Sequence, residues 1–579
     1  MTDARYLAVF WRDDAGRAEA ARVADAAITA IGLCRVARFA RGLVLAKAAS
    51  PVLALADGTG LVIGDLFARG AARRLVGLDD AAARAIATDP ARLITDYWGE
   101  YVAVLEGRDG PLVVCDPMGA HSCYAVCGDA IAVIVSDVAI ATALGRIDGS
   151  INWSALGRWL AHPGLRSEAT CINGVDEILP GTAAPILARP PTRQPLWTPW
   201  AFAAPDRQFM TRAAAVDALR ETAFLATKAC AAQTSSALLE MSGGLDSSIV
   251  AACLRHADIS VRCVSLWAPD PGADERCYAQ AVADHIAAPI EFVRLAAEDV
   301  DLMAVSPRLT PRPVDHPLKR AADLVLGRAG LKQKCDSFFS GSGGDYVLGY
   351  SGTSAPAADA LLARGPGRGF LTAVGDVAAL HDCSVWKVAG LAVRKAQRRA
   401  GVVAAPRLFL SEEVRALEAP AHPWREAAQG CWPGKREQID SLIRGQGLRE
   451  ERDRRLIAPL RMPLLSQPVV ETCLRVPSWM AVTGGRNRAV ARDAFAAYLP
   501  TAILNRRTKG NFTAFNAALV MRHRRTLREL LLDGRLSAHG LIDRRALETY
   551  FSADRPLAGA AYTAALDLAA AELWTHGWR

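Results

Sequence analysis

The stretch Met241-Ser242-Gly243-Gly244-Leu245-Asp246-Ser247-Ser248 follows the apolar run Ala237-Leu238-Leu239 and leads into Ser248-Ile249-Val250-Ala251-Ala252-Cys253-Leu254. This order predicts a strand, a glycine-rich turn and a helix. Gly243 and Gly244 would let the backbone approach an anion closely. The free N–H groups and the positive end of the helix dipole would favour a phosphate there. The stretch therefore predicts a phosphate-binding loop between a strand and a helix.

The polar residues of this loop refine that prediction. Three serines, at positions 242, 247 and 248, add hydroxyl donors. Asp246 would repel a phosphate unless a cation such as Mg²⁺ lay between them. A glycine turn with a capping residue is the simpler alternative. The loop lacks the Gly-Lys-Ser/Thr ending of the Walker loop and is not Gly-x-Gly-x-x-Gly.

The full string resembles the PP-loop of the ATP pyrophosphatase superfamily, which splits ATP into AMP and pyrophosphate. The resemblance implies ATP as a ligand, with Mg²⁺ beside it. It also implies a set of nucleotide contacts in this loop: Met241, Ser242, Gly243, Gly244, Asp246 and Ser247.

Size and composition indicate a multidomain protein of ordinary globular character. The chain has 579 residues, of which 51% are hydrophobic and 22% are charged, with a net charge of +8. No block of Lys and Arg predicts nucleic-acid binding. No signal-peptide pattern opens the chain, and its most apolar run, from 130 to 144, is broken by Ser136 and Asp137. We therefore expect a cytoplasmic protein without a membrane partner.

Cysteine and histidine patterns argue against a zinc site. The 13 cysteines form no C-x-x-C pair, and no H-E-x-x-H occurs among the 10 histidines. Free thiols in a reducing compartment are the expected state.

Residues 1–195 are predicted to form a β-rich domain. Short apolar runs alternate with Gly/Asp turns such as Arg108-Asp109-Gly110, and one Ala-rich run, 17–31, is typical of a helix. The predicted strands are 6–11, 43–45, 61–63, 101–105, 112–115 and 131–135. Several short strands separated by turns indicate a layered sheet domain.

The same region is similar to the glutamine amidotransferase domain of asparagine synthetases. The similarity lies in Trp98-Gly99-Glu100-Tyr101-Val102-Ala103-Val104, Asp116-Pro117-Met118-Gly119, Tyr124 and Ser136-Asp137. That family has an N-terminal nucleophile (Ntn) fold with a cysteine directly after the initiator methionine. This chain has Thr2 there, and its first cysteine is Cys34. We predict a retained Ntn-type fold without glutaminase activity.

A change of pattern marks the second domain, predicted to span 211–579. Residues 196–210 contain few periodic apolar positions, and prolines lie in and beside them, which is typical of a linker. Strands then alternate with helices through 213–226, 261–267, 274–283 and 290–295. The predicted fold class is therefore α/β, with a doubly wound parallel sheet that binds its ligands at the carboxyl ends of the strands.

A second loop, Ser340-Gly341-Ser342-Gly343-Gly344-Asp345, follows the apolar pair Phe338-Phe339. A glycine turn is again the simpler alternative. The position of this loop, about 100 residues after the first, resembles the synthetase domain of the asparagine synthetase family. The resemblance implies that Asp246 and Asp345 hold Mg²⁺ on the pyrophosphate and act in catalysis. It also implies that Ser340 and Gly341 lie near the nucleotide.

The C-terminal part is predicted to be mainly helical from about residue 360. Arg461-Met462-Pro463-Leu464-Leu465, Val476-Pro477, Gly485, Arg488 and Arg492 follow the order of the family. Residues 503–512 resemble its lysine loop. The resemblance implies that Lys509 contacts the α-phosphate and is catalytic, because a fixed ammonium stabilises charge that develops in the transition state. Alone, Lys509 would more often be a solvated surface residue.

The resemblance implies a ligase that activates a carboxylate as an acyl-adenylate, which an amine then attacks. Without a glutaminase, three nitrogen donors are open. Free ammonia would give asparagine. An internal amine would give a β-lactam, and the N-terminal amine of a peptide would give a macrolactam, as in lasso peptide cyclases. A non-catalytic scaffold is the alternative from another class.

Ser342 favours the peptide as the nitrogen donor. Asparagine synthetases carry Glu, and β-lactam synthetases carry Tyr, in or near this loop, whereas serine is a poor general base. A peptide N-terminal amine has a pKa near ~8 and needs less help. The Gly343-Gly344-Asp345 ending also looks like that of lasso cyclases. We therefore predict a lasso peptide cyclase of the asparagine synthetase and β-lactam synthetase family.

The predicted partners are a precursor peptide, a leader peptidase and a leader-recognition protein. Holding the two reacting ends of the peptide together would supply the proximity that ring closure requires. Asp376, His381 and Asp382 lie where β-lactam synthetases place a supporting carboxylate, but their spacing alone assigns no base.

Overall fold

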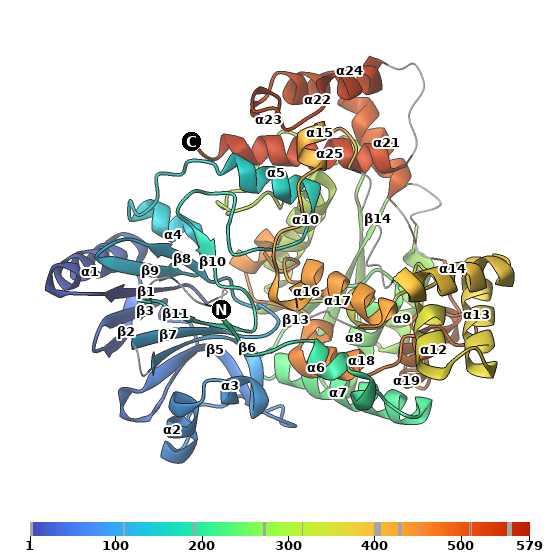
Figure 1. Ribbon diagram of the computed structural model, residues 1–579, viewed down its shortest axis with the longest axis horizontal. Helices are drawn as coiled ribbons and strands as arrows, with labels where there is room; N and C mark the ends of the chain where they lie inside the picture. The colour runs from blue at the N-terminus through green and yellow to red at the C-terminus, as the bar shows by residue number, and fades with distance from the viewer. Residues whose placement is uncertain are drawn as a thin grey trace.

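The structure is a computed structural model. It describes residues 4–107, 110–188, 193–269, 274–314, 316–398, 407–426, 431–450, 452–508, 510, 512–552 and 559–579. Figure 1 shows two antiparallel sheets at the N-terminal end, a parallel sheet at the centre, and helices that form the rest of the molecule.

The N-terminal part is a pair of six-stranded antiparallel sheets. The first runs in the order β10 (Asp176–Glu177), β8 (Tyr124–Cys127), β9 (Ile131–Val135), β1 (Tyr6–Trp11), β3 (Gly42–Ala46) and β2 (Cys34–Phe39). The second runs in the order β12 (Gln194–Pro195), β11 (Thr182–Pro185), β7 (Gly110–Cys115), β6 (Tyr97–Gly107), β5 (Gly60–Ala68) and β4 (Val52–Ala54). All six predicted strands are present.

Strand β1 shows how the layers form. Successive side chains of a strand point to opposite faces. Tyr6, Ala8 and Phe10 accordingly join the core between the two sheets, and Leu7, Val9 and Trp11 join the core on the outer face. Helices cover both outer faces: α1 (Asp14–Ala26), α4 (Val138–Ala143) and α5 (Trp153–Ala161) on the first sheet, and α2 (Asp80–Thr88) and α3 (Arg92–Thr95) on the second. The predicted layered sheet domain is confirmed as four layers.

The second part contains a five-stranded parallel sheet. Its order is β15 (Ile290–Arg294), β14 (Val261–Trp267), β13 (Ala237–Glu240), β16 (Ser337–Ser340) and β17 (Leu460–Arg461). The helices of its first half are α7 (Arg212–Cys230), α8 (Leu245–His256), α9 (Arg276–His285) and α10 (Pro317–Gln333). The predicted parallel α/β sheet is confirmed.

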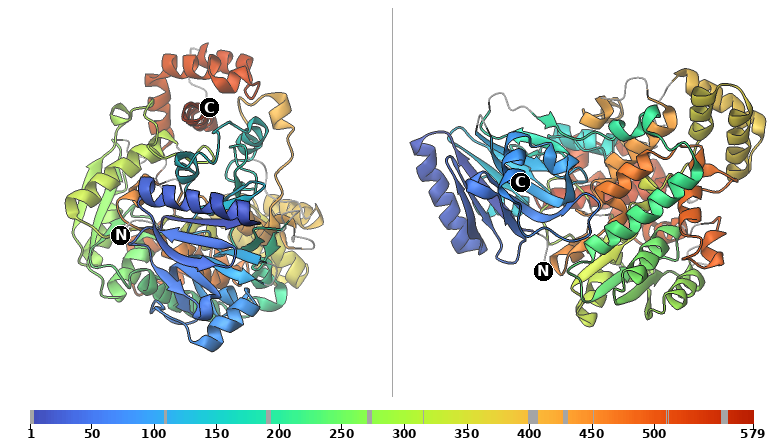
Figure 2. Two further views of the ribbon diagram at one scale, coloured as in Figure 1. Left: turned by 90° about the vertical axis from the view of Figure 1, so that its left-hand side faces the viewer. Right: turned by 90° about the horizontal axis from the view of Figure 1, so that it is seen from below.

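The remaining chain is helical, as predicted. The helices are α11 (Gly344–Val347), α12 (Ala355–Arg364), α13 (Arg368–His381), α14 (Val385–Arg398), α15 (Glu412–Arg415), α16 (Pro423–Glu426), α17 (Pro433–Gly445), α18 (Gln467–Leu474), α19 (Ala489–Ala494), α20 (Thr501–Leu504), α21 (Thr513–Arg522), α22 (Arg524–Leu532), α23 (Arg535–Ala538), α24 (Arg544–Ser552) and α25 (Ala560–His576). Helices α12–α14 share a small core and project at one end of the molecule (Figures 1 and 2).

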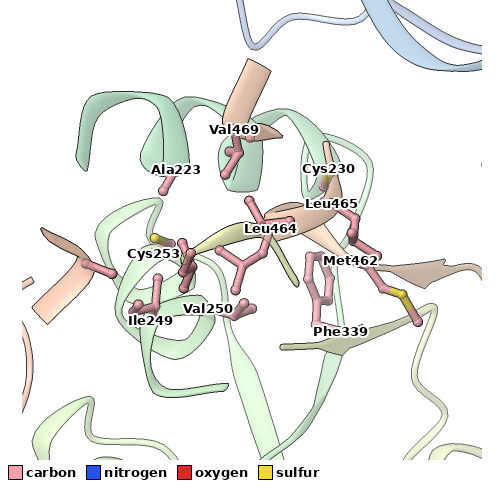
Figure 3. Packing of buried hydrophobic residues seen from close by; sticks show 14 of the residues in the cluster. Ala223, Cys230, Ile249, Val250, Cys253, Phe339, Met462, Leu464, Leu465 and Val469 are labelled. Atoms are coloured by element: carbon pink, nitrogen blue, oxygen red, sulfur yellow. The ribbon is translucent and has the colours of Figure 1, made fainter. Parts of the chain in front are cut away.

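Figure 3 shows the core that supports the parallel sheet. Val250 and Cys253 from α8, Ala223 from α7, Phe339 from β16 and Leu464 pack together. All of them are almost fully buried. This continuous apolar layer therefore holds the strands of the parallel sheet in place.

The two parts of the chain share cores. One cluster joins Leu7 and Val9 of β1 with Leu527 of α22 and Leu566 of α25. The segment predicted to be a linker contains α6 (Trp200–Ala203), and its Trp197 is buried in the core of the parallel sheet. Pro199 precedes this short helix and Pro205 follows it, yet the segment stays packed against the rest of the protein. Within the described residues, no helix is long and apolar enough to cross a membrane.

Candidate functional site

The two predicted loops lie side by side. In the parallel sheet, β13 and β16 are neighbours, and Glu240 at the end of β13 pairs with Ser340 at the end of β16. The carboxyl ends of both strands therefore lie at the same edge of the sheet, and the loops that follow them meet there.

The first loop has the conformation that its glycines predict. Gly243 has φ +67°, and a β-carbon on it would lie 2.7 Å from the Ala279 backbone nitrogen. The Ser248 hydroxyl donates to the Gly244 carbonyl at 2.7 Å, and the Ser247 hydroxyl lies 3.1 Å from that of Ser242. This hydrogen bonding fixes the turn at the start of α8, and the first turn of a helix presents its N–H groups to an anion.

Glycines also let the two loops touch. A β-carbon on Gly344 would lie 2.5 Å from Cγ of Asp246. Gly344 starts α11, and Asp345 follows in its first turn. The absence of a side chain at 344 therefore brings Asp345 beside Asp246.

Arg488 joins these two carboxylates. Its Nη1 donates to both oxygens of Asp246, at 2.8 and 2.9 Å, and to Oδ1 of Asp345 at 2.7 Å. Arg488 has φ +56° directly before α19, and its guanidinium also lies 5.5 Å from the centre of the Tyr350 ring. One cationic nitrogen is thus contacted by both acids.

This arrangement tests the predicted Mg²⁺ site. Two carboxylates that share one cationic nitrogen can share a cation, and carboxylate oxygens are the ligands Mg²⁺ takes. The described residues contain no group of three or more His, Cys, Asp or Glu that could hold a metal alone. Asp246 and Asp345 therefore fit a Mg²⁺ ion whose other ligands are phosphate oxygens and water, which is its usual arrangement at nucleotide sites.

A second network sets the strand end. The Glu240 carboxylate accepts from the Ser340 hydroxyl at 3.0 Å and from Arg454 Nη2 at 2.7 Å. Burial alone would raise the pKa of Glu240, but Arg454 and Arg452, with the hydrogen bonds, leave it below its ordinary value. Glu240 therefore stays ionised and fixes Ser340 at the start of the second loop.

Two arginines, Arg492 and Arg506, support the segment that follows α19 beside the first loop. Arg506 donates to the Gly243 carbonyl at 3.1 Å and forms an ion pair with Glu275. Arg492 donates to the carbonyls of Ile503 and Leu504, at 2.9 and 2.7 Å. These bonds hold the chain that leads to the predicted lysine loop. Lys509 itself lies outside the described residues.

These elements enclose a cavity of about 800 Å³. The predicted residues that line it are Ser242, Gly244, Asp246, Ser247, Ser340, Gly341 and Asp345. Two predicted contacts do not face it, because Met241 is buried in the apolar core and Gly243 packs against Tyr278. The cavity combines a helix N-terminus, two carboxylates and several arginines, which is the chemistry that binds a metal-bound polyphosphate.

A smaller cavity of about 220 Å³ adjoins the first. Asp345, Tyr346 and Tyr350 line both cavities. Its lining mixes polar and apolar side chains, and the apolar ones are Leu219, Val347, Leu348, Ala355, Pro356, Val476, Ala481 and Val490. Its polar groups include Arg444 and Glu437, which accepts from Thr353 at 2.8 Å and pairs with Lys395. A partly apolar molecule in this cavity would therefore reach the carboxylate of Asp345.

The structure gives different surroundings to Asp376, His381 and Asp382, the three residues for which the sequence assigns no base. Asp376 accepts from the Gly484 N–H at 2.9 Å and so fixes the loop before Arg488. Asp382 has φ +47° and ends α13. His381 lines the large cavity.

Ion pairs fill the boundary between the N-terminal sheets and the parallel sheet. Glu100 accepts from Arg449 and Arg461, both at 2.6 Å. Burial would raise the pKa of Glu100, but the two arginines hold it at about 2. Arg166 pairs with both Glu177 and Glu450. The two parts of the protein are thus joined by buried charges as well as by shared apolar cores.

Comparison with known proteins identifies the family of this chain. Residues 219–576 match the model of the asparagine synthase family. The chain belongs to this family. Its members are ATP-dependent ligases, which agrees with the polyphosphate chemistry of the large cavity. No curated protein matches the chain.

One solved structure that matches is named "Structure of the allosteric regulatory enzyme of purine biosynthesis". It is 9% identical, and the match covers 51% of this chain and 76% of that one, with a TM-score of 0.20. A likeness this weak supports no conclusion about the fold or function of this chain.

The sequence alone misses the roles of Arg488, Arg506 and Tyr350. Arg488 follows the family order, but nothing around it shows that it contacts acids 143 and 242 residues away. Nothing in the sequence indicates that this arginine has a left-handed backbone conformation, which non-glycine residues seldom adopt. The Arg-Arg-Thr-Lys run points to residue 506 only as a neighbour of Lys509.

Proposed function

We propose that the protein is an ATP-dependent lasso peptide cyclase. It would adenylate the side-chain carboxylate of an Asp or Glu in a precursor peptide, release pyrophosphate, and join the acyl group to the N-terminal amine of the peptide with loss of AMP. The observation that carries the proposal is the junction of the two cavities at Asp345, Tyr346 and Tyr350. A polyphosphate site meets a partly apolar substrate site there.

The large cavity is assigned to ATP as a PP-loop site. The loop of Ser242, Gly244 and Ser247 would hold phosphate oxygens through its N–H and hydroxyl groups. Asp246 and Asp345 would hold Mg²⁺, which when bound neutralises phosphate charge. Arg488 lies on both carboxylates and would turn toward the phosphates when the metal takes its place. Arg506, which donates to the Gly243 carbonyl, would lie beside the phosphates, and the family resemblance assigns Lys509 to the α-phosphate.

The small cavity is assigned to the peptide. A carboxylate that enters from this side reaches Asp345 and so arrives where the nucleotide site begins. Free aspartate would bring two further charges into a cavity whose lining includes eight Val, Leu, Ala and Pro side chains, and a charge beside these is costly unless it is paired. This lining therefore favours a peptide over the aspartate of an asparagine synthetase, although Arg444 and Glu437 leave some polar character.

Ser342 supports the same choice. Its hydroxyl lies 2.9 Å from that of Ser340 in the large cavity, and asparagine synthetases carry Glu, and β-lactam synthetases Tyr, in or near this loop. A hydroxyl pair supplies no strong base. An amine of low pKa, such as a peptide N-terminus, needs only a moderate base to lose its proton, whereas a more basic amine needs a stronger one.

The N-terminal part is assigned as a degenerate Ntn-type domain with a structural role. Its boundary with the synthetase part is filled by the ion pairs of Glu100 and Glu450. The amine would then come from the peptide itself. A leader peptidase would expose that amine, and a leader-recognition protein would deliver the precursor.

Mass spectrometry of a candidate precursor peptide tests the proposal. The peptide, from the same gene neighbourhood, is incubated with this protein, its leader peptidase, ATP and Mg²⁺. We expect a core peptide that has lost one water, with resistance to proteases as a sign of threading. Asp345→Asn should abolish the product, and Glu413→Gln on the exposed face of α15 is the matched control.

Two results would contradict the proposal. One is release of pyrophosphate with aspartate and ammonia alone, which would restore an asparagine synthetase. The other is no pyrophosphate release with any peptide or amino acid, which would favour a non-catalytic scaffold.

A further inference from the structure

We propose that His381 is the general base that deprotonates the attacking amine. This inference rests on the proposed function and adds the catalytic group that it lacks. His381 is the last residue of α13 and lines the large cavity together with Ala379 and Leu380. Its side chain is exposed to this space rather than buried in the α12–α14 core.

The end of α13 is fixed to the catalytic loop. The Gly484 N–H donates to Asp376 at 2.9 Å, and a β-carbon on Gly485 would lie 2.8 Å from Cβ of Ala379. Three residues after Gly485 comes Arg488, which contacts Asp246 and Asp345. His381 is thus held on the same wall as the groups that would bind the metal and phosphates, and not on a free loop.

The other basic or acidic groups of the cavity are already engaged. Asp246 and Asp345 are bridged by Arg488. Glu240 is paired with Arg454 and keeps a lowered pKa, so it is a weak base. The remaining titratable side chains of the described lining are tyrosines, arginines and Lys319, none of which is a base at neutral pH in its ordinary state. His381 is the imidazole of this described lining, and imidazole accepts protons between pH 5 and 8.

The charged groups near this helix end come from several elements. Asp376 and Asp382 lie on α13 or at its end, Lys387 lies at the start of α14, and Arg486 lies on the facing loop. Asp376 is engaged with Gly484, and Arg486 donates to Asp493 at 3.1 Å. Charges of both signs therefore lie on the elements at this helix end.

In the proposed step, the α-ammonium of the peptide gives one proton to the imidazole of His381. The amine lone pair then attacks the acyl carbon and forms the C–N bond. The bond between that carbon and the phosphate oxygen breaks, AMP leaves with both electrons of the bond, and the second proton passes from nitrogen to water. No oxidant, reductant or further reactant is required.

The test separates adenylation from amide formation. Peptide-dependent exchange of pyrophosphate into ATP measures the first step, and mass spectrometry of the dehydrated peptide measures the second. For His381→Asn we expect exchange close to wild type and a cyclisation rate lower by roughly 10²-fold or more. The variant should recover rate with added imidazole, which a merely structural role for His381 would not explain. Asp382→Asn, which keeps a side chain tolerant of the left-handed backbone, is the matched control.

Three results would overturn the inference. Cyclisation by His381→Asn at the wild-type rate and pH profile shows that His381 is not the base. Loss of exchange and cyclisation together places His381 in nucleotide or acyl binding instead. Absence of any peptide product with the wild-type protein overturns the proposed function together with the inference, and is recognised because it does not depend on the variant.

Discussion

Gly341 and Ser247 lie so close that a β-carbon at position 341 would be 2.4 Å from the Ser247 backbone nitrogen. The two residues belong to the loops after β16 and β13. Their contact brings the start of the loop after β16, at Gly341, against the serine-rich turn that follows β13. The glycine is required here by a close approach of backbone to backbone, not by a positive φ.

Gly341→Ala should therefore separate the two loops. Because the obstructing atoms are backbone, the neighbour has no flexible end to move, and we expect a loss of about 1–3 kcal/mol of unfolding free energy. Nucleotide binding should weaken further, since Asp246 and Asp345 would move apart. Thermal unfolding and nucleotide titration check this. Gly352→Ala, where a β-carbon meets nothing within 4 Å, is the control. Equal nucleotide affinity of Gly341→Ala and wild type would contradict the role given to this contact.

Arg488→Gln should increase the amount by which Mg²⁺ raises the melting temperature of the protein. In the wild type one guanidinium nitrogen contacts Asp246 and Asp345 and would compete with a metal ion for both. Removing it leaves two carboxylates without this cation, which should cost about 2–3 kcal/mol of stability in metal-free buffer. Added Mg²⁺ should restore more of the melting temperature in the variant than in the wild type, as differential scanning fluorimetry would show.

Arg486→Gln is the neighbouring control for that measurement, because Arg486 pairs with Asp493. The double variant Arg488→Gln/Asp345→Asn should lose the enhanced response. An unchanged response in Arg488→Gln would mean that the two carboxylates do not share a cation site.

The sequence predicts the two loops well and their surroundings poorly. Each loop has a local signature, an apolar strand followed by glycines and an aspartate, and parallel sheets bring such loops to one edge. The contact of Arg488 with both acids has no local signature, because it depends on how α19 packs against the two loops. The nearby prolines predict that Trp197 lies in a linker, yet burial of an indole outweighs the weak turn preference of its neighbours.

Ser441→Trp should block the small cavity and spare the large one. Ser441 lines the small cavity from α17, and its hydroxyl donates to the Glu437 carbonyl of its own helix at 2.8 Å. An indole there would occupy the space assigned to the peptide. We expect unchanged nucleotide affinity and a large rise in the peptide concentration needed for half-maximal cyclisation. Ser260→Trp, exposed at the amino end of β14, is the control. Normal peptide dependence in Ser441→Trp would move the peptide site elsewhere.

Glu100→Gln should weaken the boundary between the two parts of the protein in a pH-dependent way. Burial opposes ionisation of Glu100, but Arg449 and Arg461 hold its pKa at about 2, below its ordinary value near 4.5. A depressed carboxyl pKa contributes stability that is complete above the unfolded pKa and is lost as the pH falls toward the folded pKa. The difference corresponds to about 3 kcal/mol at neutral pH.

We therefore expect Glu100→Gln to lower the free energy of unfolding by about this amount at pH 7. The difference from wild type should shrink between pH 4.5 and pH 2, where the wild type loses the same charge. Denaturant titrations over this range check the prediction. Glu298→Gln is the control, because it removes an ion pair with Arg294 in which both side chains are about half exposed, and such a pair contributes little to stability. A pH-independent effect of Glu100→Gln would mean that shape at this boundary, and not charge, joins the two parts.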